Sequence, residues 1–304
     1  MFIPFCSSEE TSGFRNFTNI FCVTNDSSSP LFNRKITMRT HQVFFGLALS
    51  FSFLTFSFAQ ESREVSKTVS LKPDGHVFVD TYKGSITVIV WEKPSVEIHA
   101  KIESDDSFSD KYSEERVRET EISIDNTESA VRIKTDYDNV RKHRDGFFSL
   151  FDDTGSLPLV HYTITMPATA GLRIKDFKSH TTITGLRSAV DLNTYKGSAE
   201  LSELAGSLQL ETFKGKAKIR FSKLSDQSRM KTYKGDLTIS LPKGLGFEVD
   251  ADLGYRTDFH SDFSLQERER SRRHRNLVYR QPVHGGGPLL VLRSTKGSID
   301  LREH

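Results

Sequence analysis

The chain has 304 residues and a nearly balanced charge, with 42 lysines and arginines, 40 aspartates and glutamates and a net charge of +2. Bulk charge of this size points neither to nucleic acid nor to an acidic membrane surface as a partner. The two cysteines, Cys6 and Cys22, are too few for a scaffold held together by many disulfides.

An apolar stretch near the N-terminus has the pattern of a secretory signal peptide. Residues Val43–Ala59 carry no charge and follow Met38, Arg39 and His41. A basic start, a short apolar core and a small final residue predict cleavage after Ala59, because a membrane-spanning helix needs roughly 20 apolar residues. The alternative is an uncleaved anchor, which would hold the same domain outside the membrane.

Residues 1–37 form a polar leader upstream of this signal, where a secretory protein is not expected to have one. We therefore expect translation to start at Met38, residues 38–59 to form the signal peptide, and residues 60–304 to form a single domain. Both cysteines lie in the leader. The exported part, roughly 245 residues, must then be held together by burial and backbone pairing. Its predicted destination is the periplasm, the cell surface or the extracellular space.

Two segments outside the repeats described below are expected to be strands. They are Val69–Glu92 near the start and Pro288–Leu301 at the end. We expect them to form the first and last coils of the fold.

Three insertions interrupt the strand pattern, near residues 103–121, 138–157 and 264–287. The first is expected to contain a short helix over Asp110–Glu119. The second, and the mixed-charge run Glu267–Arg275 in the third, are expected to be surface loops.

A four-residue motif recurs along the chain. Complete Thr-Tyr/Phe-Lys-Gly copies begin at Thr81, Thr194, Thr212 and Thr232, and degraded copies begin at Asp176 and Ser294. The three central complete copies are 18 and 20 residues apart. Repeats of this length are typical of solenoids, in which each unit buries its apolar side only by stacking on its neighbours.

Each complete central motif is followed by alternating residues, which predicts a half-buried strand. The Lys-Gly pair predicts a turn in which glycine supplies a positive φ. A second glycine between copies, Gly185 or Gly206, precedes another alternating run, so each repeat contains more than one strand. The residues predicted to point inward are Ala199, Leu201 and Glu203 in one copy, Ala217, Ile219 and Phe221 in the next, and Leu237, Ile239 and Leu241 in the third.

These features predict an all-β fold, a β-solenoid with coils of about 20 residues and loop insertions. A β-sandwich is the second candidate.

The repeated Gly-x-apolar-x-apolar strands, VDADLGYRTDFHSDFSL from Val249 and HGGGPLLVLRSTKGSIDL from His284 resemble a bacterial family of "putative adhesins" with β-strand repeats. The resemblance covers roughly Val69–Leu301. It implies a right-handed single-stranded β-helix, in a domain of unknown function to which no biochemical activity is assigned. The corners here are mostly Lys-Gly, whereas the family uses Ser-Gly or Asn-Gly.

The most distinctive candidate site is a stripe at the repeated corner. Stacked coils would repeat its side chains every ~4.8 Å. Aromatic faces would contact sugar rings while the lysines attract an anionic polymer. The alternative, favoured because cross-strand aromatic pairs stabilise sheets without a ligand, is a self-stacking ladder with solvated lysines. The stripe consists of Tyr82 and Lys83, Tyr195 and Lys196, Phe213 and Lys214, and Tyr233 and Lys234.

A second basic surface follows one strand, with Lys216, Lys218 and Arg220 on its outer face. The register predicts that Glu200 lies beside Lys218 and Asp236 beside Lys216. Charge pairing between coils is therefore the preferred interpretation, and a polyanion groove is the alternative.

Catalysis is not expected. A polysaccharide lyase or hydrolase would need carboxylates clustered across coils. The histidines show no metal-ligand spacing and no phosphate-binding glycine loop is present, so no metal or cofactor is predicted. The candidate acids, which are scattered along the sequence, are Asp191, Glu211, Asp236 and Asp250.

The sequence thus predicts an exported, non-catalytic, adhesin-like module that binds or scaffolds in the cell envelope. Its expected partner is a cell-wall or host glycan, and nucleic acid is not expected. The alternative function is an accessory protein of envelope stress that acts through an envelope protein.

Overall fold

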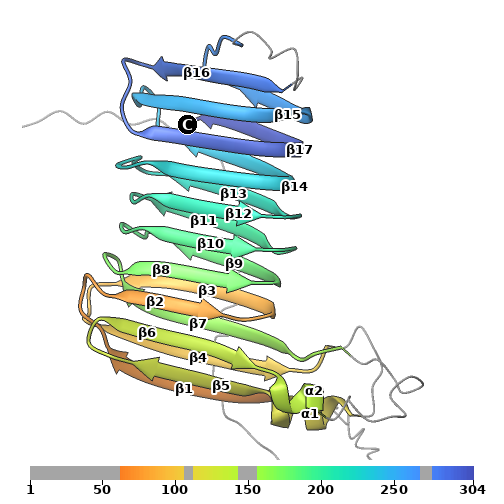
Figure 1. The fold of residues 1–304 in the computed structure, drawn as a ribbon. Coiled ribbons are helices and arrows are strands. Elements are labelled where there is room, and N and C mark those ends of the chain that lie inside the picture. Colours follow the sequence, from red (N-terminus) through yellow and green to blue (C-terminus); the bar gives the residue numbers. More distant parts are fainter. Residues whose placement is uncertain (1–61, 106–111, 143–155, 268–275) are drawn as a thin grey trace, which may run out of the picture. The chain divides into compact units, whose positions relative to one another are not determined.

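The computed structural model describes residues 62–105, 112–142, 156–267 and 276–304. The leader, the expected signal peptide at 38–59 and most of the charged run from Glu267 lie outside the described residues. The described chain is all-β, as predicted, with 17 strands and two short helices (Figure 1).

The centre of the fold is a stack of coils, each of which adds one strand to each of two rows. Strands of one row pair in parallel with the equivalent strands of neighbouring coils, so that Leu192 lies beside both Ile174 and Leu210. This is the arrangement of a β-solenoid. The first row contains β2 (His76–Asp80), β8 (Gly171–Asp176), β10 (Val190–Thr194) and β12 (Leu208–Thr212), and the second contains β3 (Lys83–Trp91), β9 (Lys178–Thr184), β11 (Ser198–Leu204) and β13 (Lys216–Phe221). The right-handed coiling implied by the resemblance stays a prediction.

The coil formed by β2 and β3 is not the first in the stack. Val79 pairs with Ile174 on one side and with Ile133 on the other, so further strands lie beyond it. The prediction that Val69–Glu92 forms the first coil is wrong, because the chain returns and adds strands past β2 and β3. The returning strands are β4 (Ser95–Glu103), β5 (Glu121–Asn126), β6 (Ala130–Asp136) and β7 (Leu159–Pro167). Strand β1 (Ser62–Ser70), which precedes β2 in the chain, pairs antiparallel with β4 and also lies on this side.

Two of the predicted insertions contain short helices. Helix α1 (Ser113–Glu119) confirms the helix expected over Asp110–Glu119, and α2 (Asp138–Lys142) begins the second insertion.

None of the helices in the described part of the chain has the length and hydropathy that crossing a bilayer requires.

The last strand of the chain does not end the stack. β17 (Leu289–Glu303) lies between β14 (Ser228–Leu241) and β15 (Phe247–Ser261), with Ile299 beside both Leu237 and Phe259 (Figure 1). The prediction that Pro288–Leu301 forms the last coil is therefore wrong. Strand β16 (Leu277–Val283) pairs antiparallel with β15, although the sequence predicted an insertion there.

The core lies between the two rows and consists of the inward residues of each strand. Eight of the nine residues predicted to point inward are buried. Glu203 is exposed, with a φ of 55°, because the pairing register shifts between Leu201 and Leu204. This bulge places Leu204 in the core, where it lies beside Phe221.

The corner glycines are required mainly by close packing between coils. A Cβ atom at Gly215 would lie 1.9 Å from the carbonyl oxygen of Gly197, and one at Gly235 would lie 2.5 Å from that of Gly215. The predicted positive φ is present at Gly84 and Gly297, with values of 130° and 113°. It is absent at the three central corners, where the prediction was wrong and the backbone of the neighbouring coil leaves no room for a side chain.

Candidate functional site

The repeated motif builds the same corner in successive coils. The hydroxyl-bearing residue at its first position points inward and is buried, as for Thr194, Thr212 and Thr232. The backbone N–H of Gly197 donates to the Thr194 hydroxyl at 3.0 Å, so this side chain closes its own turn. The next two residues, the aromatic and the lysine, are thereby turned outward.

The aromatic side chains form one continuous ladder of five face-stacked rings. The Tyr137 ring meets the Tyr82 ring edge-on at 6.3 Å and closes that end of the ladder. Parallel rings at such distances stabilise each other. The centroid distances are 4.6 Å for Tyr82–Phe177, 5.0 Å for Phe177–Tyr195, 4.7 Å for Tyr195–Phe213 and 4.9 Å for Phe213–Tyr233, with interplanar angles of at most 15°.

Stacking covers the ring faces and leaves ring edges exposed. The exposed fractions are 40% for Tyr195, 38% for Phe213 and 49% for Tyr233. The rings thus form the self-stacking ladder that the sequence analysis favoured, and no aromatic face lies open between successive rungs. Phe177 belongs to the ladder but was not among the predicted site residues, although the degraded copy at Asp176 places an aromatic there.

Replacing Phe213 with serine is expected to lower the free energy of unfolding by about 1.5 kcal/mol, because it removes two stacked contacts. The control is Tyr255→Ser, at a ring that is 60% exposed and contacts only Arg256 among the ring interactions found in the described residues. Urea unfolding of both variants measures the difference. Equal losses would show that the ladder contributes no stability.

Four lysines form a second row beside the ladder. Lys178, Lys196, Lys214 and Lys234 are exposed, and none has an ion-pair partner among the described residues. The Lys196 ammonium lies 5.6 Å from the centre of the Phe177 ring and 5.5 Å from that of Tyr195. Lys196 is thus held beside two rings of the ladder.

Lys83 does not belong to this exposed row, although the sequence placed it in the stripe. Its side chain is buried, and its ammonium lies 2.5 Å from Asp105 and also donates to Ser156. Lys178, which the prediction omitted, lies next to Lys83 in register and is exposed at this corner.

The lysine row lines a surface groove of about 710 Å³. Asp236 is the only carboxylate among its lining residues, and it lies 3.9 Å from Lys216. The groove is therefore strongly positive. We call it the lysine groove; its charged and imidazole side chains are Lys178, Lys196, Lys214, Lys216, Lys234, His180 and Asp236.

The cross-coil charge pairs predicted from the register are confirmed. Lys218 lies 3.2 Å from Glu200, and Lys216 and Asp236 are register neighbours. The interpretation of this strand's outer face as a paired surface therefore holds for both lysines.

The four candidate catalytic carboxylates each pair with a cation. Burial alone would raise the pKa of Asp250, but hydrogen bonds and charges from Arg293 and Arg280 outweigh it and lower the pKa. No group of three potential metal ligands occurs within the described ranges. The shortest nitrogen–oxygen distances in the four carboxylate–cation pairs are 2.8 Å for Asp191–Arg173, 2.7 Å for Glu211–Lys231, 3.9 Å for Asp236–Lys216 and 3.2 Å for Asp250–Arg293.

One carboxylate is buried behind the ladder. Asp176 takes the place of the inward threonine, and its Oδ1 accepts hydrogen bonds from the Ser179 backbone at 2.8 Å and the Thr194 hydroxyl at 2.9 Å. Burial raises its pKa to about 6, although these hydrogen bonds oppose the shift. The sequence signal for this site was again the degraded copy of the motif.

A comparison with curated proteins finds no match to the chain. Among solved structures, a "putative cell adhesion protein" from Clostridium sporogenes ATCC 15579 is similar, with 12% identity, a TM-score of 0.41 and coverage of 80% of this chain and 100% of that chain. A "putative adhesin" from Bacteroides fragilis NCTC 9343 has 11% identity, a TM-score of 0.30 and coverage of 80% and 97%. A "putative lipid binding protein" from Parabacteroides distasonis ATCC 8503 has 8% identity, a TM-score of 0.36 and coverage of 80% and 98%.

A family match covers the segment that carries the site. The matched segment, residues 175–284, includes four of the five ladder rings and the four exposed lysines of the row. It is shorter than the span Val69–Leu301 over which the sequence resembles the adhesin-like family. Residues 175–284 match the Toastrack DUF4097 family, a family of unknown function.

Proposed function

We propose that the chain is an exported, non-catalytic binding module of the cell envelope whose lysine groove binds an anionic glycan. The observation that carries this proposal is the row of Lys178, Lys196, Lys214 and Lys234, which have no carboxylate partners in the described chain. The signal-peptide pattern at residues 38–59 supports export.

The spacing of the row favours a linear ligand. Parallel strands repeat every ~4.8 Å, so the lysines follow the axis of the stack. Neighbouring ammonium groups at this distance repel by about 1 kcal/mol in water. An anionic chain that runs along the groove would relieve this repulsion at each coil. A globular partner would meet the row at fewer points.

The corner is also rigid, which lowers the entropy cost of binding. The ring ladder and the close packing at Gly215 fix the backbone from which the lysines extend. Exposed ring edges beside Lys196 and Lys214 give the carbon skeleton of a glycan an apolar surface. Charge would thus provide affinity, and the ring edges would position the chain.

The test is binding of the purified full chain to polygalacturonate, an anionic glycan, and to dextran, a neutral one. We expect salt-sensitive binding to polygalacturonate only. Changing Lys178, Lys196, Lys214 and Lys234 to glutamine should weaken it about 30-fold, at about 0.5 kcal/mol for each lost ion pair.

The matched control removes the same charge from four lysines that already hold ion pairs outside the groove. These are Lys72, Lys101, Lys134 and Lys231. Their replacement by glutamine should leave polygalacturonate binding within about twofold of the original. An equal loss of polygalacturonate binding in both variants would show that the effect comes from net charge alone. Absence of binding by the original protein would reject the proposal. A protein partner retained in pull-downs would then favour the envelope-stress alternative.

A further inference from the structure

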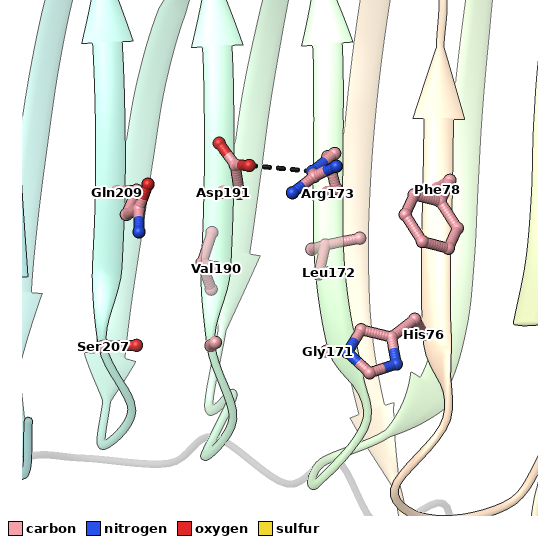
Figure 2. Close-up of a pocket in the computed structure, with 10 residues that line it drawn as sticks. His76, Phe78, Gly171, Leu172, Arg173, Val190, Asp191, Ser207 and Gln209 are labelled. Atoms are coloured by element: carbon pink, nitrogen blue, oxygen red, sulfur yellow. Dashed lines mark hydrogen bonds and ion pairs between the residues drawn. The ribbon is translucent and has the colours of Figure 1, made fainter. Parts of the chain in front are cut away.

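A second hollow lies on the outer surface of the first strand row, over β2, β8, β10 and β12 (Figure 2). Its volume is about 450 Å³, within the usual range of small-ligand sites. None of its lining residues lines the lysine groove. It is therefore a separate feature of the surface.

The floor of the hollow consists of small residues at equivalent positions of three coils, Gly171, Ala189 and Ser207. His76 lies beside Gly171 in register, and a Cβ atom at Gly171 would lie 2.7 Å from the imidazole Cδ2. Glycine thus lets the imidazole approach β8. Larger side chains at these three positions would fill the space.

Aromatic rings form one end of the hollow. His76 and Phe78 lie next to each other along β2, with ring centroids 6.2 Å apart and an interplanar angle of 22° (Figure 2). The guanidinium carbons of Arg132 and Arg173 lie 5.0 and 5.8 Å from the Phe78 ring centre and hold it in place. The planes of the two rings are therefore nearly parallel.

Polar, planar side chains continue from this surface across the neighbouring strands. Arg173, Asp191 and Gln209 are register neighbours on β8, β10 and β12, and Figure 2 shows them in one line. The Arg173 Nε donates to Asp191 Oδ2 at 2.8 Å, so the pair carries no net charge. The row still offers both donors and acceptors, because guanidinium, carboxylate and amide groups can each form several hydrogen bonds.

We propose that this hollow binds one unit of a neutral saccharide. The C–H face of a sugar ring would lie against His76 and Phe78, and its hydroxyls would bond to Arg173, Asp191 and Gln209. An anionic unit would find the nearest arginine already neutralised. The proposal stands independently of the lysine groove, because the two sites share no residue and differ in charge.

The test is saturation-transfer NMR and calorimetry of the full chain with three neutral hexasaccharides: β-1,4-linked glucose, β-1,4-linked N-acetylglucosamine and α-1,4-linked glucose. We expect at least one to bind with an affinity that changes less than about twofold between 50 and 300 mM salt, since no net charge is involved. Phe78→Ala should weaken it at least about tenfold by removing the platform.

Ala189→Trp provides a second variant, because this position is exposed and the added ring should fill the hollow without disturbing the core. It should also weaken binding at least about tenfold. The matched control is Ile89→Ala, at an apolar side chain that is 48% exposed on β3 and lies outside the hollow. The variant in which Lys178, Lys196, Lys214 and Lys234 are changed to glutamine should bind the hexasaccharide as well as the original protein does. The proposal is overturned if none of the hexasaccharides binds, or if Phe78→Ala and Ala189→Trp bind as well as Ile89→Ala.

Discussion

Replacing Gly215 with alanine is expected to lower the free energy of unfolding by about 4 kcal/mol. The new Cβ would lie 1.9 Å from the Gly197 carbonyl oxygen, a backbone atom that can move only if two coils separate. Separation would lengthen the backbone hydrogen bonds between strands of neighbouring coils. It would also move apart the stacked rings of Tyr195 and Phe213, which lie at the same corner. Urea unfolding followed by circular dichroism measures the loss.

Gly244→Ala is the matched control for this prediction. Gly244 has a φ of 71°, and a Cβ atom added there would have no other atom within 4 Å, so alanine meets backbone strain but no clash. Its expected cost is about 1 kcal/mol. If Gly215→Ala lowers the free energy of unfolding no more than Gly244→Ala does, the neighbouring coils are not as closely packed at Gly215 as the 1.9 Å distance requires.

The second large effect concerns the buried Asp176. Its pKa is about 6 in the folded protein against an ordinary value of 3.8, so the folded state binds the proton more tightly than the unfolded state. The stability from this group is fully present below about pH 3.8 and is lost as the pH rises through about 6. At pH 7.5 the buried carboxylate then costs up to about 3 kcal/mol.

Asp176→Thr should remove this cost and restore the motif of the neighbouring coils, where Thr194 accepts from the backbone N–H three residues on. We expect the variant to exceed the original protein by up to about 3 kcal/mol at pH 7.5 and to lose that advantage by pH 4. Unfolding midpoints at pH 4, 5, 6 and 7.5 give the comparison. A constant difference across this range would show that Asp176 does not titrate as described.

Both predictions concern the corner that also carries the candidate site. The glycines bring the coils into contact, the threonines at the first motif position point inward, and the aromatic and lysine side chains are left facing outward in rows. The affinity expected of the lysine groove thus depends on packing behind it. A variant that opens the stack at Gly215 should therefore also scatter the lysines and weaken binding of an anionic glycan.

Much of the site could be predicted because the motif repeats. The period of the motif identified the corner, and the glycine alignment identified Glu200 as the neighbour of Lys218, which lies 3.2 Å away. Lys83 could not be predicted, because its burial depends on Asp105 and Ser156, which follow it by 22 and 73 residues. The hollow over Gly171 was also missed, since small residues become a floor only once three coils are stacked.

The sequence by itself determined the all-β class, the coil repeat, the inward positions of most strands and the stripe at the corner, because alternation and repetition are local properties of the chain. Only the tertiary structure decided the order of the coils. β17 fills the position between β14 and β15, and strands from residues 95–167 lie beyond β2 and β3. Every coil presents the same apolar pattern to its neighbours, so the pattern allows many orders. The choice among them depends on which strand edges remain free after the rest of the chain has paired.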